Sequence, residues 1–197
     1  MDLNWSFDGV EWKPVTRILT SMLLVIGSRS TPWSPEAQEF VMKESSGELD
    51  EPLGHELLRE AWTNRGQNPR SSIVLAVAAA EVGFKQFAVR AFPETEWILE
   101  NLQSPPLINM LKKFPWSKFV SPLSDIVPTV PKSIIKELDN AVSMRNKIVH
   151  TGVAELKGKT VESVIASVRD LLYFLDALEG QSWAINHMSQ EARKGFA

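Results

Sequence analysis

Cysteine is absent from this chain of 197 residues. Without a thiol there is no disulfide framework, no thiolate metal site and no cysteine nucleophile, which suits a reducing compartment. Histidine is scarce too, with three in the sequence, and neither His55 nor His187 has neighbouring ligand residues at metal spacing. Gly-rich phosphate loops and the Gly-x-Ser-x-Gly elbow of hydrolases are also missing. We therefore predict no metal site and no cofactor.

Long apolar runs are lacking as well. The most apolar early stretch, residues 18–26, is too short to cross a bilayer. Residues 1–13 contain no basic segment that leads into an apolar run, so we expect no signal peptide. These features predict a cytoplasmic protein without a membrane partner.

The net charge of −3 argues against a protein that coats nucleic acid. The charge is unevenly spread, however. Residues 36–60 hold eight acids and two bases, whereas residues 109–159 hold nine bases and four acids. The basic region either meets phosphates or consists of lysines that solvate exposed helix faces.

The apolar periodicity predicts an all-α single domain over residues 1–197, since strand patterns are scarce. We expect an N-terminal helical extension to residue 68, with helices near 14–27, 35–44 and 53–62. A central helix should run from Ser71 or Ser72, which would cap it, to Phe92. It is apolar on most of its circumference, with Glu81 as the acid in its middle.

The region from residue 93 to 131 carries seven of the twelve prolines. We interpret it as an irregular insertion with short helices near 97–102 and 107–114, which either packs on the surface or has a function. Two long amphipathic helices then follow, one from Pro131 to Gly152 and one from Thr160, as its cap, to Gly180. The tail to residue 197 should be a short helix or frayed.

The hexapeptide Arg145-Asn146-Lys147-Ile148-Val149-His150 lies at the end of the first of these helices. On a helix, Asn146 and His150 are four residues apart and share a face. Arg145 points about 140° away from His150, at about 100° per residue. It therefore reaches a shared site either by curling its long stem or by meeting groups from another surface. The second option predicts a dimer in which two of these helices face each other.

These groups suit the cleavage of RNA without a metal. An imidazole titrates near neutrality and can act as a base or an acid. A guanidinium donates to phosphate oxygens, and Asn146 can orient the imidazole or a phosphate oxygen. The alternatives are structural: His150 at a helix C-terminus, Asn146 facing solvent, and an ion pair of Arg145 with Glu81 or Asp139.

The form Arg145-Asn146-x-x-x-His150 resembles the signature of the HEPN superfamily, which is Arg, four to six residues and His, commonly with Asn after the Arg. Residues 72–81 look like the other recurrent helix of that family, which is small and apolar with an acid near its middle. The order of the helices also agrees. The resemblance covers roughly residues 70–180, so we expect a HEPN-like core over 69–180 that includes the insertion.

The resemblance implies a helical bundle that dimerises along the signature helices and often acts as a metal-independent endoribonuclease, commonly a toxin or an anti-phage defence effector. Arg145 and His150 would then be the catalytic pair, supported by Asn146. Glu81 would orient one of them, or form a structural pair with Arg145. The family also contains members that bind nucleotides or only dimerise.

Four further residues are candidates for binding RNA. They are Lys147, Lys113, Lys118 and Trp116, the last of which could stack on a base or pack in the core. Three other tryptophans on predicted helices are expected to be core or interface anchors: Trp62, Trp97 and Trp183.

We therefore expect a homodimeric endoribonuclease that cleaves single-stranded or loop RNA. The rival is a non-catalytic module that binds a partner protein or a nucleotide, with the acidic region 36–60 as a partner surface or an inhibitory mimic of RNA. An enzyme that an inhibitory or activating partner controls fits the sequence equally well. In an enzyme, Arg145 and His150 should line an open basic cleft; in the module they should be buried and fully hydrogen-bonded.

Overall fold

The computed structural model divides the chain into two compact units, Met1–Glu51 and Pro52–Ala197. It describes residues 4–5, 13–14, 51–101, 106–152 and 158–197. In the first unit, β1 (Asn4–Trp5) pairs antiparallel with β2 (Lys13–Pro14). Pro14, expected to open a helix, therefore lies in a strand. The rest of the helices predicted over 14–27 and 35–44 falls outside the described residues.

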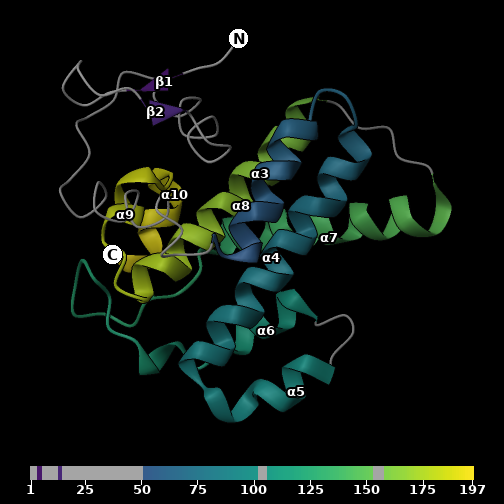
Figure 1. Ribbon diagram of the computed structural model, residues 1–197. Coiled ribbons are helices and arrows are strands. Elements are labelled where there is room, and N and C mark those ends of the chain that lie inside the picture. The colour runs from purple at the N-terminus through teal and green to yellow at the C-terminus, as the bar shows by residue number, and fades with distance from the viewer. Residues whose placement is uncertain (1–3, 6–12, 15–50, 102–105, 153–157) are drawn as a thin grey trace. The chain divides into compact units, whose positions relative to one another are not determined.

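The second unit is helical, as the apolar periodicity predicts (Figure 1). Its long helices pack against one another around α4, and short helices fill the insertion and the C-terminus. In chain order the elements are α3 (Leu53–Asn64), α4 (Pro69–Ala91), η1 (Pro93–Thr95), α5 (Glu96–Asn101), α6 (Leu107–Lys113), η2 (Trp116–Lys118), α7 (Lys132–Thr151), α8 (Gly158–Leu178), α9 (Trp183–His187), α10 (Gln190–Arg193) and η3 (Lys194–Phe196).

Helices α3 and α4 form one packed pair. Asn68 caps α4 by accepting a hydrogen bond from the Ser71 backbone N–H at 3.2 Å, and Pro69 occupies the first turn. The cap predicted at Ser71 or Ser72 is thus wrong. Ser72 is fully buried instead, and its hydroxyl donates to the Ala61 carbonyl oxygen of α3 at 2.6 Å. This bond ties α3 to α4, and both helices belong to the second compact unit, which begins at Pro52.

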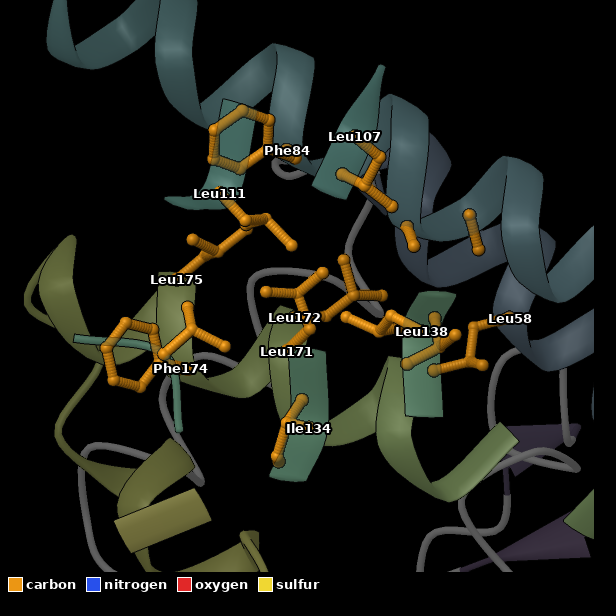
Figure 2. Packing of buried hydrophobic residues seen from close by; sticks show 14 of the residues in the cluster. Leu58, Phe84, Leu107, Leu111, Ile134, Leu138, Leu171, Leu172, Phe174 and Leu175 are labelled. Carbon is orange, nitrogen blue, oxygen red and sulfur yellow. The ribbon is translucent and has the colours of Figure 1, made fainter. Parts of the chain in front are cut away.

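Helix α4 contacts α3, α7 and α8, so it is the centre of the unit. It is also the helix of the described chain that is long and apolar enough to cross a membrane, but 56% of its apolar window is buried within the unit. A position in the core accounts for that hydropathy. Figure 2 shows Phe84 of this helix among leucines from α6 and α8.

The proline-rich insertion packs into the core with several of its side chains. Leu107, Leu111, Trp116 and Val130 are buried. The rings of Phe114, Trp116 and Phe119 contact Phe87 of α4, with centroids 5.3–6.3 Å apart. These three aromatic side chains therefore anchor the irregular stretch of residues 93–131 to the helical bundle.

The ends of α7 and α8 are partly as predicted. Gly152 has φ of +65° and closes α7, and Gly180, with φ of +95°, follows α8. The predicted cap at Thr160 is wrong, because α8 already begins at Gly158. The tail is helical and not frayed: Phe196 is fully buried and stacks on Phe174 with a centroid distance of 4.4 Å.

The buried residues of α7 lie in its first half, and the second half packs against the core through side chains that are only partly buried. The buried residues are Ile134, Leu138 and Ala141, whereas Val149 near the end of the helix is 59% exposed. In Figure 1 the last turns of α7 stand out at the right of the view. The hexapeptide motif therefore sits on a projecting helix end.

Candidate active site

An open groove of about 540 Å³ runs beside the end of α7. Helix α7 forms one side, α4 contributes Glu81, and α6 with the residue before it forms the rest. The groove brings all three motif residues to one place. Its lining residues are Glu81, Pro106, Leu107, Ile108, Asn109, Lys112, Asp139, Val142, Arg145, Asn146 and His150.

Arg145 forms an ion pair with Glu81, in which Nη2 of the guanidinium donates to Oε1 of the carboxylate. Both side chains are mostly buried, with 20% and 15% of their surfaces exposed respectively. The structure thus selects Glu81 over Asp139 as the partner of Arg145. The buried Nε of Arg145 has no hydrogen-bond partner among the described residues, so the guanidinium keeps a donor unused.

The carboxyl of Glu81 lies in a partly desolvated position. Burial raises its pKa above the ordinary value of 4.5, and the neighbouring Arg145 and Lys85 oppose that rise. Burial disfavours the charged form of a carboxyl, and nearby cations favour it. The net direction means that Glu81 takes up a proton more readily than an exposed glutamate.

Asn146 and His150 are exposed, and the structure records no hydrogen bond from either side chain within the described part of the chain. They remain accessible to a ligand that enters the groove. Arg145 lines the same groove within a single chain.

The charge of the groove is balanced. Lys112 and Arg145 supply two cations, and Glu81 and Asp139 supply two carboxylates. The groove is therefore open, as an enzyme requires, but not the basic cleft that the local charge of the sequence suggested. Lys112 and Asp139 were not among the predicted site residues. Lys112 lies four residues after Ile108, so the two side chains share the face of α6 that lines the groove. The spacing of these residues in the sequence is the signal that could have pointed to Lys112.

The four predicted RNA-binding residues do not gather in this groove. Lys113 and Lys118 are exposed but line neither of the grooves beside α7, and Lys147 lines a different groove. Trp116 is only 6% exposed, and its Nε1 donates to the Leu111 carbonyl oxygen at 2.9 Å. Of the two alternatives for Trp116, the structure shows packing in the core, so its ring is not available to stack on a base.

The other aromatic and histidine predictions have mixed outcomes. Trp62 and Trp97 are 42% and 67% exposed, so neither is a core anchor in this chain. His55 lies 3.1 Å from the Asp176 carboxylate and stacks on Tyr173. Within the described ranges, no group of three or more His, Asp or Glu side chains could hold a metal ion.

No protein-family model matches the chain, and no curated protein and no solved structure is similar to it. The resemblance to the HEPN superfamily therefore rests on the residues of the motif and on the order of the helices that carry it. The groove geometry is the basis for assigning a function.

Proposed function

We propose that this protein is a metal-independent endoribonuclease of HEPN type, acting on single-stranded or loop RNA. The observation that carries the proposal is that Arg145, Asn146 and His150 line one open groove at the end of α7. They supply a permanent cation, a carboxamide and an imidazole within reach of one ligand.

In this proposal the ribose 2′-hydroxyl attacks the adjacent phosphorus, and the imidazole of His150 takes up its proton. The bond from phosphorus to the 5′-oxygen breaks, and that oxygen receives a proton from an imidazolium or from water. The products are a 2′,3′-cyclic phosphate and a 5′-hydroxyl. Arg145 stabilises the negative charge that develops on the phosphate, using the donors that Glu81 leaves free. DNA is not cleaved, because it lacks the 2′-hydroxyl.

The proposal includes a homodimer through the end of α7. Near the end of the helix Val149 exposes an apolar side chain, 59% of it accessible. A second copy would cover this surface and place a second His150 near the first. Such an arrangement supplies a base and an acid from two identical chains.

A non-catalytic binding module is the second candidate, and the pairing of Arg145 with Glu81 favours it. An arginine held by a buried carboxylate has less charge to offer a phosphate. The equal numbers of cations and carboxylates in the groove also favour a binding module. In this case the groove would bind a nucleotide or a segment of a partner protein without chemistry.

Cleavage of labelled total RNA in EDTA tests the proposal. The wild type should yield fragments with cyclic-phosphate ends, and His150→Ala should lose about 100-fold or more in rate, the lower end for removal of an acid–base group. Arg145→Ala should lose a comparable factor by removing the charge that stabilises the phosphorane. Folding and oligomeric state are checked for each variant by circular dichroism and sedimentation.

His187→Ala is the matched control, because it removes a histidine that lies outside the groove. It should cleave RNA like the wild type. If the folded wild-type protein leaves RNA intact, or if His150→Ala cleaves as fast as the control, the ribonuclease proposal fails. Binding without cleavage would support the second candidate.

A further inference from the structure

A second groove, of about 560 Å³, lies between α7 and the start of α8. Six of its eight lining residues carry polar side chains: Asn140, Ser143, Thr160, Ser163, Lys147 and Glu137 line it together with Met144 and Val164. Hydroxyl, carboxamide and ammonium groups are the side chains that proteins use to hold the phosphates of nucleic acids. The chemistry of this groove therefore suits a phosphodiester chain.

The two grooves share the helix α7. At about 100° per residue, the stripe of Asn140, Met144 and Lys147 lies about a third of a turn around the helix from the stripe of Asp139, Asn146 and His150. Lys147 follows Asn146 in the chain and precedes His150 by one helical turn. A strand that leaves the motif groove over the projecting end of α7 would therefore meet Lys147 next.

Glu137, the acid that lines this groove, lies away from Lys147. Glu137 is ten residues before Lys147, about 15 Å along the helix axis. Lys147 lies one helical turn after Ser143, while Thr160 and Ser163 line the groove from α8. The cation thus stands apart from the carboxylate, so a phosphate bound at Lys147 meets little repulsion from Glu137.

We propose that the groove between α7 and α8 binds backbone phosphates of the RNA strand that flank the cleaved bond. Lys147 supplies the charge, and Ser143, Thr160 and Ser163 donate hydrogen bonds. This inference rests on the proposed ribonuclease function for its substrate but assigns a separate surface. Because phosphates carry no sequence information, the groove should position RNA and leave the choice of sequence to the motif groove.

Binding to a short single strand of fully 2′-O-methylated RNA, which cannot be cleaved by 2′-hydroxyl attack, measures RNA binding apart from cleavage. The slope of log K against log salt concentration should fall in magnitude by about 0.7 in Lys147→Ala, as for the loss of one phosphate contact on a single strand. Ser163→Asp should weaken binding further by placing a carboxylate in the groove. Lys132→Ala is the control, because it removes an exposed lysine of the same helix that lines neither groove.

The failures of the two proposals are distinguishable. If Lys147→Ala and Lys132→Ala give the same salt slope while the wild type cleaves RNA, the groove inference is wrong and the ribonuclease stands. If the slope falls in Lys147→Ala but no variant cleaves RNA, the groove binds RNA and the ribonuclease proposal fails. The absence of any binding overturns the groove inference. Circular dichroism on each variant confirms that the fold is kept.

Discussion

Replacing Gly54 by alanine should destabilise the helical unit, because α3 and α4 touch backbone to backbone at this position. A Cβ on Gly54 would lie 2.9 Å from Cα of Gly83, 3.1 Å from its nitrogen and 3.2 Å from the carbonyl oxygen of Ala79. All three atoms belong to the backbone of α4. No change of rotamer relieves the contact, so the two helices must move apart.

The size of the effect follows from this geometry. Non-bonded carbon atoms pack at about 3.5–4.0 Å, so the crossing must open by roughly 0.6–1.1 Å. Overpacking of this kind costs about 1–3 kcal/mol. Alanine recovers up to about 1 kcal/mol through its higher helix propensity, and less at Gly54, which lies in the first turn of α3. The net loss should be about 1–2 kcal/mol, or roughly 2–8 °C in Tm.

Gly83 offers a sharp comparison, since its obstacle is a side chain. A Cβ there would lie 2.3 Å from Cδ2 of Leu172, which is buried in α8. Shortening Leu172 to alanine removes the obstacle to Gly83→Ala but not the one to Gly54→Ala. A double-mutant cycle should therefore show favourable coupling of Leu172→Ala with Gly83→Ala, and coupling near zero with Gly54→Ala.

Urea unfolding followed by circular dichroism measures these differences. Gly66→Ala is the control, because no atom lies within 4 Å of a Cβ placed at Gly66. If Gly54→Ala is as stable as Gly66→Ala, the close crossing of α3 and α4 is refuted. Equal coupling of Leu172→Ala with both glycine variants would refute the assignment of the two different obstacles.

Two further predictions concern pH. Because the pKa of Glu81 is raised in the folded state, its contribution to stability is full below the ordinary value of 4.5 and is lost as the pH rises through the raised pKa. The stability of the wild type relative to Glu81→Gln should therefore fall as urea unfolding is repeated at rising pH, and a difference that grows would contradict the raised pKa. Burial, with smaller effects from Arg169 and Arg193, lowers the pKa of His187 below 6.5. As the pH falls, the unfolded chain binds a proton at His187 before the folded protein does. The wild type should therefore lose stability relative to His187→Gln as the pH falls through 6.5. Parallel curves of unfolding free energy against pH for the two proteins would exclude this.

The long helices could be predicted from the sequence because their apolar residues recur with helical periodicity. The expected end of α7 at Gly152 is confirmed, since glycine readily adopts the left-handed conformation seen there. The starts of helices were harder to predict. The sequence around Ser72 offers several capping residues, and the choice of Asn68 depends on the burial of Ser72 against Ala61, which is a tertiary contact.

In the proline-rich insertion, too, tertiary contacts could not be predicted from the local sequence. Its prolines correctly indicate irregular backbone, but proline content says nothing about which side chains are buried. Trp116 lies between Lys113 and Lys118, and this surrounding charge suggested an exposed ring. In the structure the ring packs with Phe87 of α4 and Phe174 of α8, both far from Trp116 in the chain. Local sequence cannot reveal contacts of that range.

The division of the motif among different faces of α7 explains why its neighbouring residues have different surroundings. The buried stripe runs through Leu138 and Ala141, and Arg145 follows them by seven and four residues, so it continues that stripe and faces Glu81 of α4. His150 points more than a third of a turn away, towards solvent, at about 100° per residue. A change at Arg145 therefore alters the folding energy and the groove together, whereas a change at His150 acts on the groove alone. For this reason His150→Ala isolates the chemistry of the site, and Arg145→Ala is interpretable only with its stability measured beside it.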